Sequence, residues 1–136
     1  MTTTKTQKLP TGYQKVGRIN FTRAKAARIS AADILINDNH ITHIANDHKK
    51  ELEALHISAI DYVTMIVQRY DEIRKNQGNS ILLVKTNPDK ANDTITIELV
   101  LNIKYKFWEI RTAQPRSNLT KNKLLWSVKK TNLPKF

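Results

Sequence analysis

Apolar side chains recur at helical spacing between residues 37 and 56, which predicts an amphipathic helix there. Its apolar face comprises Ile41, Ile44, Ala45, His48, Leu52 and Leu55. Asn37 or Asp38 is a suitable N-cap for this helix. The same spacing predicts a second helix from about Ser58 to Asn76, and Gly78 lies just beyond its end, where a glycine commonly stops a helix.

The period of the pattern changes from helical to alternating after residue 79. Strands are predicted over residues 80–86, 94–105, 107–113 and 123–130, with a turn at 88–93 and a basic loop at 115–122. In the longest strand, five apolar residues share one side: Ile95, Ile97, Leu99, Leu101 and Ile103. The pattern therefore predicts an α+β domain, in which two N-terminal helices pack on a mostly antiparallel four-stranded sheet.

Residues 1–17 are rich in threonine, lysine and glutamine, and they contain Pro10 and two glycines. This composition predicts a flexible basic tail or linker. Residues 18–36 alternate weakly and are expected to begin with a short strand or helix. We therefore expect one domain over residues 18–136, a size that supports a single modest core. No run approaches the roughly 18 apolar residues of a transmembrane helix, so no membrane segment is expected in this chain.

Charge is distributed unevenly along the chain, whose formal net charge is +11. Residues 1–32 carry seven lysines and arginines and no acid, a balance of +7. Residues 33–98 carry seven bases and eleven acids, a balance of −4, and residues 99–136 carry nine bases and only Glu109, a balance of +8. Two basic ends around a nearly balanced middle favour a nucleic acid as partner. The alternatives are a basic chain that is kept soluble by its charge and one that meets only an acidic protein partner.

All four histidines lie within 17 positions, from His40 to His56. Histidine exchanges protons near neutral pH, so this cluster suggests acid–base chemistry. His43 and His48 are five residues apart and would diverge by about 140° around a continuous helix, so they do not form a single-face metal pair. His40 and His43, three apart, could share a metal with Asp47, but no third strong ligand is evident. The chain has no cysteine, and no metal site or cofactor is predicted.

The histidines have different expected roles. His48 lies on the apolar face, so it is either a candidate catalytic group or a packed residue with satisfied ring nitrogens. His43 is more open, which suits proton transfer but also fits an ordinary surface residue. His40, at the helix start, would have its protonated form disfavoured by the helix dipole, which favours a neutral base. His56, at the helix end, is expected to be structural or solvent-exposed.

The segment from 107 to 118, F-W-E-I-R-T-A-Q-P-R-S-N, is the second group of candidate residues. Arg111 and Arg116, with the nearby Lys121 and Lys123, could hold phosphate, and Thr112 and Ser117 could donate hydrogen bonds to its oxygens. On a regular strand, Trp108, Ile110 and Thr112 share one side, and Phe107, Glu109, Arg111 and Ala113 share the other.

Aromatic residues in this basic third have two possible roles. Tyr105, Trp108 and Trp126 could stack on bases, although aromatics in such strands more often pack in the core. Glu109 is the lone acid here, which makes it first a salt-bridge partner and only second a catalytic base.

The order of elements, with H-I-x-x-x-H on a helix, F-W-E-I-R-T on a strand and a later basic L-L-W segment, resembles the barnase/EndoU/colicin/RelE nuclease superfamily. The resemblance is nearest to its phage-associated and polymorphic-toxin members, of the contact-dependent inhibition type, and covers roughly residues 33–130. It implies a metal-independent endoribonuclease toxin domain, often aimed at tRNA. Such domains act in the bacterial cytoplasm after delivery as the C-terminal part of a larger secreted toxin, and a cognate immunity protein, here expected to be acidic, neutralises them.

The resemblance also implies a mechanism in which the RNA 2′-hydroxyl attacks phosphorus and leaves a 2′,3′-cyclic phosphate. His43 is then the expected base or acid, with Arg111, Thr112 and Arg116 around the phosphate. The second proton carrier is another histidine, Tyr105, Glu109 or a lysine. Two other classes stay open: a non-catalytic nucleic-acid-binding module of phage or mobile-element origin, and a protein-interaction domain whose histidines are merely packed.

Overall fold

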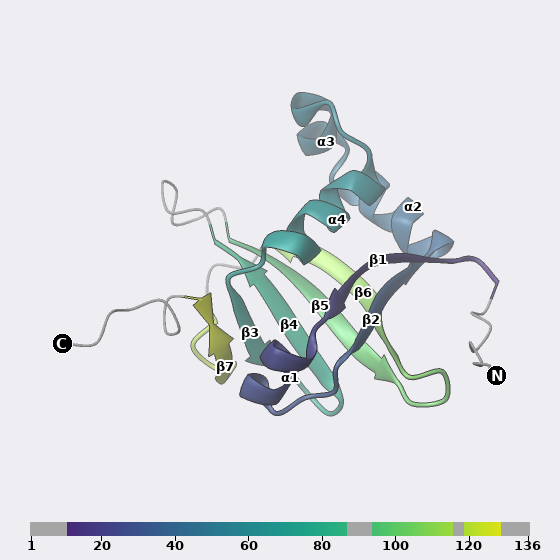
Figure 1. Cartoon of the computed structure of the whole chain (residues 1–136). Coiled ribbons are helices and arrows are strands. Elements are labelled where there is room, and N and C mark those ends of the chain that lie inside the picture. Colours follow the sequence, from purple (N-terminus) through teal and green to yellow (C-terminus); the bar gives the residue numbers. More distant parts are fainter. Residues whose placement is uncertain (1–10, 87–93, 116–118, 129–136) are drawn as a thin grey trace.

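The computed structural model describes residues 11–86, 94–115 and 119–128 of the chain, and these form one seven-stranded sheet with four helices (Figure 1). The strands are β1 (Tyr13–Ile19), β2 (Ala32–Asn37), β3 (Glu72–Lys75), β4 (Ser80–Lys85), β5 (Ile95–Asn102), β6 (Phe107–Pro115) and β7 (Leu124–Ser127). The helices are α1 (Phe21–Ala27), α2 (Asp38–Asp47), α3 (Lys49–Leu55) and α4 (Ala59–Arg69). The α+β class expected from the sequence is confirmed.

The strand order is β1-β2-β6-β5-β4-β3-β7. Every pairing is antiparallel except that of β2 with β6, where Ile34 lies opposite Trp108 and Leu35 opposite Glu109. Helix α2 follows β2 without a linker. Because β2 runs parallel to β6, the start of α2 lies beside the later half of β6. The functional candidates from two distant parts of the chain meet at this point.

The expected arrangement of two N-terminal helices on four strands is wrong, because helices and strands are interspersed. The predicted second helix, 58–76, ends at Arg69, and Tyr70 already has an extended backbone (φ −62°, ψ 149°). Residues 72–75 form β3, whose Ile73 is fully buried opposite Leu83. Ile73 fits a helical stripe and an inward strand position equally well, and pairing with β4 decides between them.

The N-terminal region also differs from the expectation of a tail through residue 17. Strand β1 begins at Tyr13 and pairs with β2 along its length, so residues 13–17 belong to the domain. Gly17 lies against α4, where an added Cβ would overlap the Val67 side chain. Residues 18–36, expected to begin with a strand or a helix, supply the end of β1, then α1 and β2.

The main core lies between the sheet and α2, α3 and α4, which gather at one end of the sheet, whereas α1 lies near the other (Figure 1). Its most buried members include Ile34, Ile36, Val63, Ile66, Ile73, Leu83, Ile97, Leu99 and Ile110. The apolar alternation predicted for 94–105 is present in β5 at Ile95, Ile97, Leu99 and Leu101, but the strand ends at Asn102, residues 103–106 turn, and Ile103 is 68% exposed. The turn expected at 88–93 lies outside the described residues.

Candidate active site

A cavity of about 440 Å³ lies between α2 and the later half of β6. It is lined by His40, His43, Ile44, Asp47, His48, Arg111, Thr112 and Ala113. All five residues proposed from the sequence as catalytic, three histidines with Arg111 and Thr112, therefore meet in one place. This hollow is the α2–β6 cavity below.

The start of α2 positions the first two histidines. Asn37 ends β2 and caps the helix, because its side-chain oxygen accepts a hydrogen bond from the His40 backbone N–H at 3.0 Å. The Asp38 backbone N–H donates to the Gly12 carbonyl at 2.9 Å, which ties the same turn to the segment before β1. His40 therefore lies in a fixed first turn, and His43 follows on the next.

A break between α2 and α3 brings the third histidine into the cavity. His48 ends α2 and precedes α3 with non-helical angles (φ −119°, ψ 26°). The expectation that His43 and His48 diverge assumed one continuous helix. Because the helix is interrupted at His48, both residues line the same cavity.

Both ring nitrogens of His48 already have partners. Its Nε2 lies 2.8 Å from the Ala113 carbonyl oxygen, and its Nδ1 lies 3.1 Å from a carboxylate oxygen of Glu51. Both partners are acceptors, so the doubly protonated ring satisfies them together. The side chain is only 9% exposed. This geometry favours the packed role over the catalytic role for His48, as a link between α3 and β6.

Tyr62 of α4 supports the same link. Its hydroxyl donates to the Glu51 carboxylate at 3.4 Å, and its ring centroid lies 5.7 Å from that of His48. Burial, together with the Glu51 charge, raises the pKa of Tyr62 far above its ordinary value. Tyr62 therefore stays a neutral hydrogen-bond donor beneath the cavity.

His40 has an unused ring nitrogen. Its Nδ1 is buried and has no hydrogen-bond partner among the described residues. Burial lowers the pKa of His40 below 6.5, and the charge of Arg111 and that of a protonated His43 act in the same direction, whereas the charge of Glu109 opposes them. The neutral imidazole that the sequence favoured on dipole grounds is therefore favoured chiefly by burial. A neutral imidazole at the edge of a cavity can accept a proton.

A β-bulge turns Arg111 toward the cavity. Opposite β5, Thr112 pairs with Glu98 and Ile110 with Leu99, so Arg111 between them has no partner. Consequently Arg111, Thr112 and Ala113 line the cavity in succession, and the strict alternation expected for 107–113 is wrong at this point. Arg111 is exposed, so its guanidinium is accessible to an anion in solution.

Glu109, which is buried, and Tyr13, which is half-buried, form a hydrogen-bonded pair beside these residues. Glu109 is 8% exposed, and the Tyr13 hydroxyl donates to its Oε2 at 2.9 Å. Sequence reasoning ranked Glu109 as a salt-bridge partner, and no ion pair joins it within the described part of the chain. Tyr13 was missed because it fell in the presumed tail. The sequence did offer one indication of a special role for Glu109, because it is the single acid in the basic C-terminal third of the chain.

The aromatic residues proposed to stack on bases are mostly packed. Trp126 is 8% exposed, with Tyr70 against it edge-on at 5.6 Å and the Arg23 guanidinium 4.7 Å from its ring centroid. Trp108 is buried and donates to the Ser30 carbonyl at 2.9 Å. Their burial favours the core role over the stacking role for the two tryptophans.

Of the other proposed phosphate-binding residues, those that the structure describes do not line the cavity. Lys121 and Lys123 lie beside β7, which three strands separate from β6, a span of about 19 Å. Tyr105 lies in the turn before β6, half-buried, with the Lys104 ammonium 5.2 Å from its ring. Arg116 and Ser117 lie outside the described residues.

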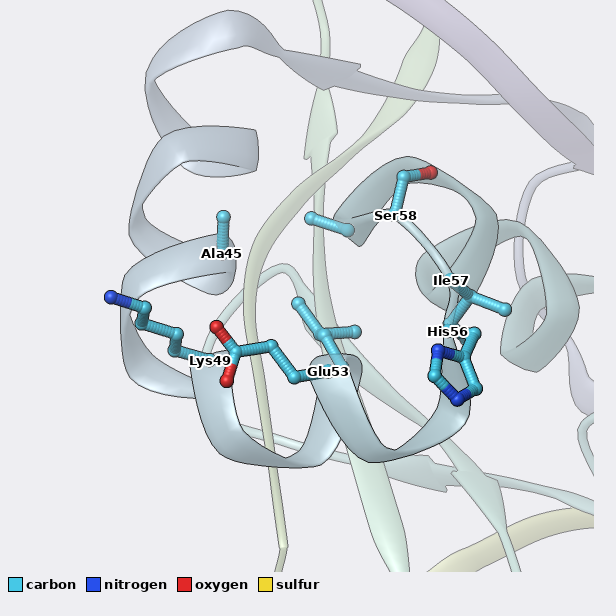
Figure 2. Close-up of a pocket in the computed structure, with 8 residues that line it drawn as sticks. Ala45, Lys49, Glu53, His56, Ile57 and Ser58 are labelled. Atoms are coloured by element: carbon cyan, nitrogen blue, oxygen red, sulfur yellow. The ribbon is translucent and has the colours of Figure 1, made fainter.

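A second hollow of about 560 Å³ lies on the helices, away from β6. We call it the α3–α4 groove; it is lined by Ala45, Lys49, Leu52, Glu53, His56, Ile57, Ser58 and Ala59. Figure 2 shows Lys49 and Glu53 on one side of it and His56 on the other. His56 ends α3 with left-handed angles (φ 56°, ψ 40°) and is exposed, as the sequence suggested.

Within residues 11–86, 94–115 and 119–128, no three histidine, aspartate or glutamate side chains are placed to hold a metal ion. None of the described helices is long and apolar enough to cross a membrane. Comparisons of the chain with protein-family models, with curated proteins and with solved structures find no match.

Proposed function

We propose that this chain is a metal-independent endoribonuclease whose active site is the α2–β6 cavity. The observation that carries the proposal is the convergence there of a neutral imidazole, His40, a solvent-accessible imidazole, His43, and the guanidinium of Arg111. Proton transfer combined with cationic stabilisation is what cleavage of a phosphodiester by its own 2′-hydroxyl requires.

The reaction assigns one role to each group. His40 takes the proton of the 2′-hydroxyl as O2′ bonds to phosphorus. His43, protonated, donates a proton to the departing 5′-oxygen as the P–O5′ bond breaks. Arg111 neutralises the charge that develops on the non-bridging oxygens, and Thr112 donates a hydrogen bond to one of them. The products are a 2′,3′-cyclic phosphate and a free 5′-hydroxyl.

Charge supports a polyanionic substrate. The chain carries a net charge of +11, and its C-terminal third contains a single acid, Glu109, which is buried. From the family resemblance we further propose tRNA as the substrate, the bacterial cytoplasm as the place of action after delivery by a larger toxin, and an acidic immunity protein as the partner that blocks the site. Electrostatic complementarity would speed capture by such a partner.

The test is incubation of the purified protein with total tRNA in EDTA, with the product ends mapped. We expect cleavage that leaves cyclic phosphate and 5′-hydroxyl ends, and none from a His43→Ala/Arg111→Ala double variant. Salt-sensitive RNA binding without cleavage would favour the nucleic-acid-binding module instead. Absence of both cleavage and binding would favour the protein-interaction domain.

A further inference from the structure

The hydrogen-bonded pair of Glu109 and Tyr13 has no part in the proton transfers proposed above. Glu109 does not line the α2–β6 cavity, yet it lies on β6 two residues before Arg111. A carboxylate that is 8% exposed loses most of its hydration and persists only with compensating partners. The Tyr13 hydroxyl supplies one, at 2.9 Å from Oε2.

Tyr13 also connects this carboxylate to the helix that carries His40. Tyr13 lies opposite Asn37 in the pairing of β1 with β2, and the Asn37 side-chain oxygen accepts a hydrogen bond from the His40 backbone N–H. Gly12, the residue before Tyr13, accepts from the Asp38 N–H with its carbonyl. Strand β1, the N-cap of α2 and strand β6 are thus joined at one point, behind His40.

The charges around His40 come from both neighbouring elements. Glu109 and Arg111 act on it from β6, and His43 acts on it from its own helix. Glu109 is the only one of the three that stabilises the protonated ring. Its charge therefore offsets part of the lowering of the His40 pKa that burial and the neighbouring positive charge produce.

We propose that Glu109 and Tyr13 are positioning residues, which hold the first turn of α2 against β6 so that His40 faces the bound phosphodiester. This inference rests on the proposed function. It assigns Glu109 a role through His40 and not contact with the substrate, and it explains why an acid occupies this position in an otherwise basic third of the chain.

The test compares Glu109→Gln and Tyr13→Phe with the unaltered protein. Glutamine keeps the shape but removes the charge, and phenylalanine keeps the ring that packs edge-on against Phe107 at 5.4 Å but removes the hydroxyl. We expect cleavage to fall roughly 10–100-fold, as when an outer hydrogen-bond partner of a functional histidine is removed. With Glu109→Gln, the acid limb of the pH–rate profile should also move to lower pH, because His40 loses a favourable charge.

NMR titration of the histidine ring protons gives a second, activity-independent readout. The His40 midpoint should fall in Glu109→Gln, whereas Asp33→Asn, which removes an acid paired with Arg18 at 2.8 Å on β2, should leave it unchanged. An unchanged His40 midpoint together with lost cleavage would show that Glu109 acts directly as the base and overturn the positioning role. Unchanged cleavage and midpoint would overturn it as well. If the unaltered protein cleaves no RNA, the proposed function fails, and with it the catalytic role of the pair.

Discussion

The α2–β6 cavity and the α3–α4 groove are built from adjacent parts of the same helical segment, yet they differ in chemistry. The groove is the larger, at about 560 Å³ against 440 Å³, and each contains at least one histidine. The groove lies among helices that are close in sequence. The cavity instead lies between α2 and a distant strand, and the hydrogen bond from His48 to Ala113 on that strand spans 65 residues of the chain. Size alone therefore does not identify the site.

The charged groups of the two hollows also differ in what surrounds them. In the groove, Lys49 and Glu53 are exposed, opposite in charge and one helical turn apart, which is the ordinary pattern of a solvated helix face. In the cavity, His40 is partly buried and its Nδ1 has no partner among the described residues, and the exposed Arg111 lies at a bulge and lines the same hollow. The second arrangement costs stability and is typical of functional sites.

Replacement of one exposed histidine in each hollow should give the largest difference in RNA cleavage rate between the cavity and the groove. His43→Ala is expected to slow RNA cleavage by about 10²–10⁴-fold, the usual cost of losing a proton carrier. His56→Ala, a matched change in the groove, should leave the rate within twofold. Initial rates on one tRNA substrate, beside thermal melting of both variants, make the comparison. Equal rates for the two variants would remove His43 from the mechanism.

Replacement of one cation in each hollow is the next largest contrast. Arg111→Ala should reduce cleavage by about 10²–10³-fold, because a preorganised donor to the developing charge is lost. Lys49→Ala should weaken RNA binding slightly at most, since its charge lies away from the cavity. Single-turnover rates at saturating protein separate the chemical step from binding. An Arg111→Ala effect confined to binding would assign Arg111 to substrate capture alone.

The chemistry of the cavity was predictable from the sequence, but its assembly was not. The crowding of histidines and the group Arg111-Thr112 were evident as residue types. Their meeting depends on the parallel pairing of β2 with β6 and on the bulge at Arg111, which no local pattern encodes. The role of Tyr13 was not evident from the sequence, because its flanking residues have the composition of a tail and its partner, Glu109, lies 96 residues further along the chain.

The elements themselves were predictable where one periodicity prevailed. The Asn37 cap and the β5 alternation are present as expected. Strand β3 was mistaken for the end of a helix because Ile73 satisfies both patterns, and only pairing with β4 and β7 decides its conformation. Competition between local period and non-local pairing explains most of the missed topology.

The histidine that links the two walls of the cavity should matter for stability more than for chemistry. His48→Ala is expected to lower the free energy of unfolding by about 1–3 kcal/mol, because it leaves the buried Ala113 carbonyl without its partner. His56→Ala, at the exposed end of α3, should change it by less than about 0.5 kcal/mol. Urea denaturation at pH 7 measures both. A stable but inactive His48→Ala would instead return His48 to the catalytic set.

The smallest expected difference is in the pH dependence of stability. Because burial lowers the pKa of His40 in the folded state, the unfolded chain binds a proton more readily, and stability must rise with pH across that interval. The contribution of His40 is therefore complete above the unfolded pKa, near 6.5, and is lost as pH falls through the lower folded value. His40→Gln should lose less stability than the unaltered protein between pH 7 and 5, whereas His56→Gln should behave like the unaltered protein. Urea denaturation at the two pH values measures the difference, and parallel losses in all three proteins would show that His40 titrates as it does in the unfolded chain.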